Sequence, residues 1–85
     1  MNIVYTSRMK EDVARLPQDI KERLKHLILF LAQDVRHPYL HTKPLKDQWK
    51  GCFAFRITRS YRCIFQVTDA QILLLMIDHR KDVYR

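Results

Sequence analysis

The chain has 85 residues, a hydrophobic fraction of 47% and a single glycine. These values indicate one compact domain over residues 1–85 and exclude a disordered or low-complexity polymer. Lysine and arginine outnumber aspartate and glutamate by 16 to 9, which gives a formal charge of +7. This excess favours a polyanionic partner, but charge alone does not distinguish RNA, DNA, an acidic protein and anionic lipid.

The sequence has no apparent membrane segment. Its longest apolar runs, residues 27–32 and 72–77, have six residues each, far below the roughly 20 residues that a membrane helix needs. The N-terminus also lacks the apolar stretch of a signal peptide. We therefore expect a cytoplasmic protein that does not associate with membranes.

The cysteines and histidines do not have the spacing of a metal site. Cys52 and Cys63 are not paired at zinc-site distances in the sequence, and in a reducing compartment they are interpreted as buried thiols. His37 and His41 lie in a lysine-rich segment, where solvated histidines are ordinary. The sequence therefore predicts no metal and no other cofactor.

The N-terminal part predicts one strand followed by two helices. Residues 2–6 are β-prone, and Ser7 is expected to cap a short helix that runs towards Leu16. Pro17 ends that helix and suits the first turn of the next one. The second helix carries an apolar stripe, made of Ile20, Leu24, Leu27 and Leu31. Further apolar residues widen the stripe, so we expect the C-terminal half of this helix to be sandwiched in the core.

The second part of the chain predicts a loop and then three strands. Residues 36–50 mix prolines, histidines and lysines without a period, which indicates a surface loop. From Cys52 onward three apolar stretches, broken near Arg59 and Asp69, indicate an antiparallel meander. The predicted fold is α+β with the order β-α-α-β-β-β, in which a helical hairpin packs on one face of a small, mainly antiparallel sheet. The other face is left open for function.

Two arginines are predicted to face each other on the open side of the sheet. Because side chains alternate between the two faces of a strand, Arg56 is expected on the face opposite its apolar neighbours. Arg62 has the same arrangement on the next strand. If residues 58–60 form a three-residue loop, the two arginines stand about 5 Å apart at Cβ. Such a pair costs stability unless an anion lies between the two charges, although each arginine could instead lie flat and solvate its head group.

The direction of Arg80 is open. In the last strand both alternating sets of positions are apolar, so alternation does not show which sheet face Arg80 is on. A two-residue loop at Asp69 and Ala70 would turn Arg80 to the face opposite the other arginines. A bulge near Asp78 could restore its direction.

Four segments together resemble the RelE/ParE toxin superfamily, and the RelE type in particular, over nearly the whole chain. They are Lys43-Pro-Leu-Lys46, Trp49-Lys-Gly51, Ser60-Tyr-Arg-Cys-Ile-Phe-Gln-Val67 and Asp78-His-Arg-Lys-Asp-Val-Tyr84. The resemblance implies the toxin of a type II toxin-antitoxin system, a metal-independent endoribonuclease that cuts mRNA on the ribosome. In that reaction the 2′-hydroxyl of the substrate attacks the adjacent phosphate. The implied partners are a cognate antitoxin, the ribosome and mRNA.

The resemblance also implies catalytic roles for individual residues. Arg62 would hold phosphate and stabilise the charge of the pentacoordinate state, a task that suits a guanidinium. Arg80 would stabilise the departing 5′-oxygen, Tyr84 would stack on or orient a nucleotide, and Arg56 matches a basic residue of the preceding strand. Relatives often carry a lysine where this chain has Ala54, which leaves the general base open.

Other residues have weaker assignments. His79 could serve as the general base, although a histidine at a strand end is more often structural. Lys43, Lys46 and Lys50 could form a surface that binds RNA, or could simply be solvated.

Two other functions are compatible with the sequence. A ParE-like toxin of the same fold would inhibit DNA gyrase without nuclease activity, and fold and charge suit it equally well. The full set of Arg56, Arg62, Arg80 and Tyr84 favours the nuclease, because gyrase-directed relatives generally lack it. A non-enzymatic nucleic-acid-binding module would explain the charge but not the facing arginines.

Overall fold

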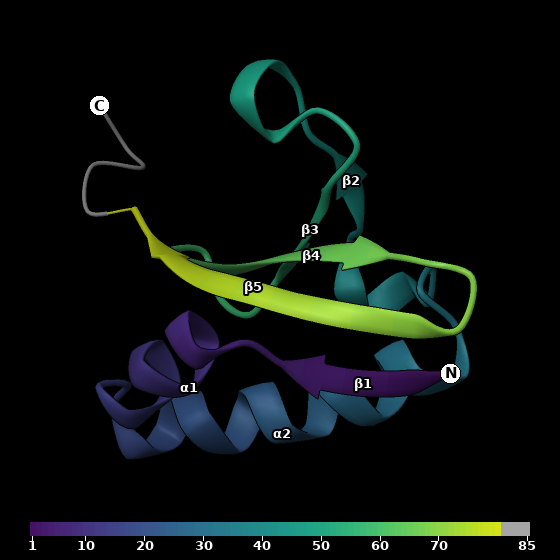
Figure 1. Ribbon diagram of the computed structural model, residues 1–85. Coiled ribbons are helices and arrows are strands. Elements are labelled where there is room, and N and C mark those ends of the chain that lie inside the picture. The colour runs from purple at the N-terminus through teal and green to yellow at the C-terminus, as the bar shows by residue number, and fades with distance from the viewer. Residues whose placement is uncertain (81–85) are drawn as a thin grey trace.

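A computed structural model describes residues 1–80 and contains two helices packed on one face of a five-stranded sheet (Figure 1). The elements are β1 (Asn2–Tyr5), α1 (Ser7–Ala14), α2 (Gln18–Gln33), β2 (Lys43–Pro44), β3 (Phe53–Arg56), β4 (Tyr61–Val67) and β5 (Gln71–His79). The strand order is β1-β5-β4-β3-β2, with β1 parallel to β5 and every other pair antiparallel. The α+β fold with a helical hairpin on one sheet face is thus confirmed.

The first helix begins one residue earlier than the sequence indicates. Thr6, and not Ser7, is the N-cap, because its Oγ1 accepts a hydrogen bond from the Met9 amide at 3.2 Å. The same hydroxyl lies 2.9 Å from the Leu74 carbonyl, to which it donates. Thr6 therefore joins the start of α1 to β5 at the point where β1 ends.

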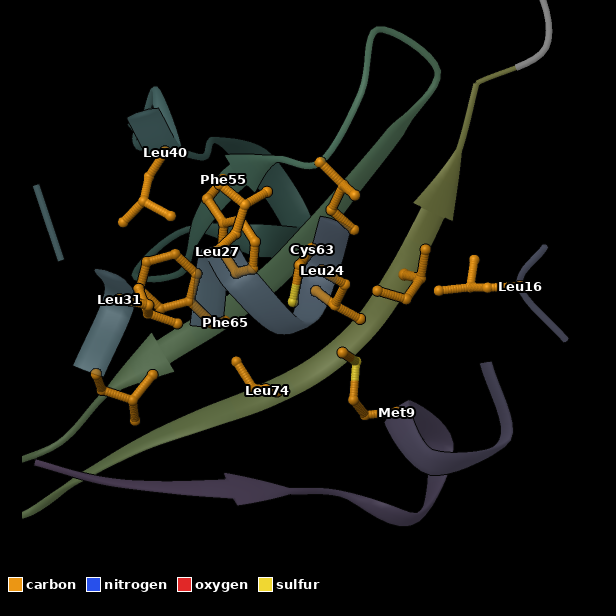
Figure 2. Close-up of a cluster of buried hydrophobic side chains, with 13 residues drawn as sticks. Met9, Leu16, Leu24, Leu27, Leu31, Leu40, Phe55, Cys63, Phe65 and Leu74 are labelled. Atoms are coloured by element: carbon orange, nitrogen blue, oxygen red, sulfur yellow. The ribbon is translucent and has the colours of Figure 1, made fainter. Parts of the chain in front are cut away.

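The core lies between the helices and the sheet. On α2 the buried side chains are Leu24, Leu27 and Leu31, and Figure 2 shows them beside Phe55 and Phe65 of the sheet. The expectation that the C-terminal half of α2 is sandwiched is wrong, because Leu29 is 62% exposed. A helix that covers the outer face of a two-layer fold buries only one side.

The segment predicted as a loop over residues 36–50 contains short regular elements. Two 3-10 turns, η1 (Pro38–Leu40) and η2 (Asp47–Trp49), flank β2. β2 pairs with β3 through Lys43 opposite Ala54 and Pro44 opposite Phe53, which adds a fifth strand at the sheet edge. Proline is tolerated there because an edge strand has one side without a ladder partner. In Figure 1 the chain between β2 and β3 rises on the side of the sheet away from the helices.

A bulge in β5 sets the direction of every residue after it. Phe65 pairs with Leu74 but Ile64 pairs with Met76, so Leu75 is the extra residue. Before the bulge the buried residues are Ile72 and Leu74, at even-numbered positions, whereas after it the buried residue is Ile77, at an odd-numbered position. The bulge that the sequence allowed near Asp78 therefore exists, but it lies three residues earlier.

The α1 helix supports β5 beyond the end of β1. The amide of Ile77 donates to the Asp12 carboxylate at 3.0 Å. The same carboxylate pairs with Arg8 at 3.1 Å, and the Asp12 side chain is only 12% exposed. A helix side chain thus replaces the missing strand neighbour and fixes the part of β5 that leads to Asp78 and Arg80.

Candidate active site

A basic pocket of about 440 Å³ lies on the sheet face opposite the helices. This volume is within the range of roughly 300–1,000 Å³ that is usual for small-molecule sites. Among residues 1–80, no aspartate or glutamate lines it, whereas six lining residues carry basic side chains: His41, Lys43, Arg56, Arg59, Arg62 and Arg80. A pocket of this composition favours a ligand with several negative charges.

The predicted pairing of Arg56 with Arg62 is confirmed. The amide of Ile57 donates to the Tyr61 carbonyl at 3.0 Å, which closes a loop over residues 58–60. Arg56 then pairs with Arg62 across β3 and β4. Side chains of directly opposed residues share one sheet face, and here that face is the one opposite the buried residues Phe55 and Cys63.

The carboxylate of Asp78 supplies a negative charge beside the two arginines. Asp78 lies opposite Arg62 on β5, and Arg62 Nε donates to Asp78 Oδ2 at 2.8 Å. The Arg62 side chain is 26% exposed and the Asp78 side chain 33% exposed. Arg62 therefore does not simply lie flat with a solvated head group, because its Nε is bonded to Asp78. Asp78 compensates part of the repulsion between the arginines.

Arg80 lies on the same face as Arg62. Because of the bulge at Leu75, Asp78 and Arg80 lie on the same sheet face as Arg62, and Arg80 lines the pocket. The Arg80 amide donates to the Ser60 carbonyl at 2.6 Å, and its Nε lies 3.9 Å from Asp78 Oδ2. Three arginines from three adjacent parts of the sheet thus meet in one pocket.

His79 does not join this group. It is paired with Tyr61, and the two rings stack with centroids 4.1 Å apart and planes at 7°. Tyr61 packs against the core on the helix side, so His79 lies on the face opposite Arg62. This placement gives no support to His79 as the general base. Tyr84, the other predicted residue of the C-terminal segment, lies outside the described residues.

The three predicted RNA-binding lysines occupy two different places. Lys43 is on β2 and lines the pocket. Lys46 and Lys50 flank the η2 turn, are exposed and do not line the pocket. Lys43 can therefore contact a ligand in the pocket, while the other two extend the positive surface beside it.

The sequence interpretation missed three residues of the site. The sequence indicates Asp78 only as the position of a possible bulge, whereas its pairing with Arg62 depends on the register of β4 and β5. Arg59 is in the hairpin loop that borders the pocket. His41 lies in the other wall with a left-handed φ of 50°. A periodicity search finds none of these because all depend on which segments face each other.

The two cysteines do not line the pocket, and they differ in exposure. Cys63 is fully buried, as expected, whereas Cys52 is only partly buried. Burial, together with the charge of Asp12, raises the pKa of the Cys63 thiol far above its usual range. In the described part of the chain no three His, Cys, Asp or Glu side chains are grouped to hold a metal ion. Over the same residues, no helix has both the length and the apolar character needed to cross a membrane.

Comparisons with known proteins agree with this fold. Residues 3–84 match a family model described as the ParE toxin of type II toxin-antitoxin system, parDE. Toxin RelG of Mycobacterium tuberculosis is 31% identical over 84 residues, which cover 95% of this chain and 92% of that protein.

Solved structures of toxins have the same architecture. A YoeB/ParE toxin from Agrobacterium tumefaciens superposes with a TM-score of 0.82 at 20% identity, covering 94% of this chain and 99% of that one. A chain of the archaeal RelE-RelB complex from Pyrococcus horikoshii OT3 gives 0.79 at 18% identity, covering 95% and 96%. The sequence motifs, the fold and the family match agree, and the chain belongs to the ParE toxin family of type II toxin-antitoxin systems, within the RelE/ParE superfamily.

Proposed function

We propose that this toxin is an endoribonuclease that cuts mRNA on the ribosome, in the cytoplasm, without a metal ion or other cofactor. The observation that carries the proposal is the convergence of Arg56, Arg62 and Arg80 on one face of the sheet, in a pocket with basic walls. A toxin that acted only by docking on a protein would not need the guanidinium groups of four arginines, these three and Arg59, around one small cavity.

The reaction that suits these groups is an internal attack within the RNA strand. The 2′-hydroxyl gives its proton to a general base while its oxygen forms a bond to the adjacent phosphorus. The bond from phosphorus to the 5′-oxygen breaks, and the 5′-oxygen takes up a proton. The products are a 2′,3′-cyclic phosphate and a 5′-hydroxyl. Arginine stays protonated at any working pH and can hold two phosphate oxygens at once, so it stabilises the charge that grows in the transition state.

Each arginine has a distinct part in this proposal. Arg62 binds the non-bridging oxygens of the reacting phosphate, because its Nε bond to Asp78 leaves the other guanidinium N–H groups for substrate. Arg80, at the end of β5, stabilises the leaving 5′-oxygen. Arg56 adds positive charge across the strand from Arg62. Tyr84 would stack on a nucleotide, and the identity of the general base is left open between groups of the toxin and of the ribosome.

The lysines serve binding in this scheme. Lys43 contacts a phosphate of the bound mRNA from the pocket wall, while Lys46 and Lys50 approach ribosomal RNA beside the pocket. Contacts of this kind are electrostatic and depend on salt. They are expected to affect affinity more than the rate of cleavage.

The proposed protein partner is a cognate antitoxin with an acidic or amphipathic segment that covers the arginine face or displaces Tyr84. A free toxin with a basic pocket requires neutralisation, and coverage of the pocket by a complementary charge provides it. The RelE structure from Pyrococcus horikoshii, solved in complex with RelB, supports the expectation of such a partner.

Expression of the toxin without its antitoxin tests the proposal against the gyrase alternative, which the ParE family match keeps relevant. Growth should stop, and primer extension should reveal new mRNA ends inside translated regions. A supercoiling assay with purified gyrase should give the same result with and without the toxin. Intact transcripts together with inhibited supercoiling would assign the protein to the gyrase inhibitors.

A further inference from the structure

We propose that Asp78 is a positioning residue of the active site, whose carboxylate holds Arg62, and secondarily Arg80, in the orientation needed at the reacting phosphate. The inference rests on the proposed nuclease function and assigns a role within the same site. It concerns a negative charge placed among groups whose task is to attract a polyanion.

The geometry of the contact favours a fixed orientation for Arg62. Asp78 is directly opposite Arg62 in the β4–β5 ladder, so both backbones are held by the sheet. The bond runs from Nε to Oδ2 at 2.8 Å, a short distance typical of a charge-assisted hydrogen bond. An arginine held at Nε cannot rotate its guanidinium freely, and its terminal N–H groups are then aimed by the carboxylate.

The second arginine depends on the same oxygen. Arg80 Nε lies 3.9 Å from Asp78 Oδ2, and its side chain is 52% exposed. Arg56 lies on the other side of Arg62. Without a carboxylate between them, the like charges of Arg62 and Arg80 would separate the two side chains. Asp78 therefore keeps together two groups that would otherwise move apart.

A purely stabilising ion pair is the other interpretation of Asp78, and the two have different consequences. A partly exposed ion pair adds little to folding stability, and a carboxylate beside the pocket weakens its attraction for phosphate. If Asp78 only stabilised the fold, its loss would lower the folding stability and leave the cleavage rate at saturating ribosomes unchanged. If it positions Arg62, its loss lowers the cleavage rate, while binding stays equal or becomes tighter.

The test compares Asp78→Asn with the wild-type toxin on ribosomes that carry a defined mRNA. Asparagine has the same shape but no charge. We expect the single-turnover rate at saturation to fall by about 10- to 100-fold, the size of effect that a displaced catalytic group can have. The ribosome concentration for half-maximal rate should stay equal or decrease. Asp69→Asn, the matched control, removes the same charge in the exposed β4–β5 turn and should retain the wild-type rate.

Two further variants test how Asp78 acts. Asp78→Glu keeps the charge and should cleave faster than Asp78→Asn; an equal or lower rate would overturn the inference. In the Arg62→Ala background, adding Asp78→Asn should cost much less than the product of the two single losses, because the main group that Asp78 holds is already gone. A full multiplicative loss would show that Asp78 does not act through Arg62.

The outcomes separate this inference from the proposed function. If the wild-type toxin does not cut ribosome-bound mRNA, the proposed function fails. If the wild type cuts and Asp78→Asn cuts at the same saturated rate, the nuclease stands and the positioning role of Asp78 is refuted. Circular dichroism of each variant verifies that it is folded, and Asp78→Glu carries the test if the Asn variant is not.

Discussion

Replacement of Arg62 by alanine should separate catalysis from binding. Arg62 is in the pocket, 26% exposed, and bonded to Asp78 at 2.8 Å. Lys46→Ala is the matched comparison, because it removes the same charge from an exposed position outside the pocket. Both variants lower the net charge by one, so the total charge of the protein does not explain a difference between them.

The size of the Arg62 effect follows from its proposed role. A preorganised donor to charge that develops in the transition state is worth roughly 10²- to 10³-fold in rate, or about 2.7–4 kcal/mol. Because the Arg62–Asp78 pair is partly exposed, its loss should change the free energy of unfolding by only about 0–1 kcal/mol. Arg62→Ala should therefore be folded at the assay temperature and cut at least about 100 times more slowly at saturation.

The assay measures single-turnover cleavage as the concentration of programmed ribosomes is varied. Arg62→Ala should lower the plateau and leave the half-saturation point nearly unchanged. Lys46→Ala should keep the plateau, shift the half-saturation point upwards and reduce the slope of log affinity against log salt by about 0.7–0.9. Full activity of Arg62→Ala at saturation would refute the catalytic role of this arginine.

Three further predictions concern the fold. Asp12→Ala should reduce the free energy of unfolding in urea by about 1–3 kcal/mol, because it leaves the Ile77 amide unsatisfied. The control Glu11→Ala, on the exposed side of α1, should change the free energy of unfolding by less than about 0.5 kcal/mol. Equal effects of the two substitutions would contradict the support of β5 by Asp12. In the native protein iodoacetamide should modify Cys52 and spare the buried Cys63, so rapid double modification would contradict the packing. The raised pKa of Cys63 means that its thiol ionises more readily in the unfolded chain. Stability should therefore be full below about pH 9 and should fall above it by up to about 1.4 kcal/mol per pH unit. Cys63→Ala should flatten this dependence, and an unchanged slope would show that it has another origin.

The facing arginines could be predicted from the sequence because a short loop fixes a register. Residues 58–60 are flanked by alternating apolar positions, so a three-residue loop leaves one pairing of Arg56 with Arg62. The helical hairpin was similarly accessible from the apolar stripe of α2 and the proline before it. These features depend on neighbours in the sequence.

The direction of Arg80 and the role of Asp78 could not be derived in that way. The bulge at Leu75 lies inside an apolar run, residues 72–77, where no polar residue marks a change of parity. The loop at 69–70 alone would have put Arg80 on the helix side, and the bulge reverses this. Strand β2 was missed for a related reason, since two residues that include a proline have no periodicity and are ordered by pairing with β3.

Cleavage of an mRNA with one altered sugar tests the central claim most directly. The mRNA is placed on the ribosome with a single 2′-deoxyribose on the 5′ side of the bond that the toxin cuts in unmodified RNA. Cleavage there should be lost, whereas the unmodified mRNA should yield a 5′ fragment that ends in a 2′,3′-cyclic or 3′ phosphate. An unchanged rate of cleavage at the 2′-deoxy position would contradict attack by the 2′-hydroxyl, and with it the proposed arginine-based nuclease mechanism.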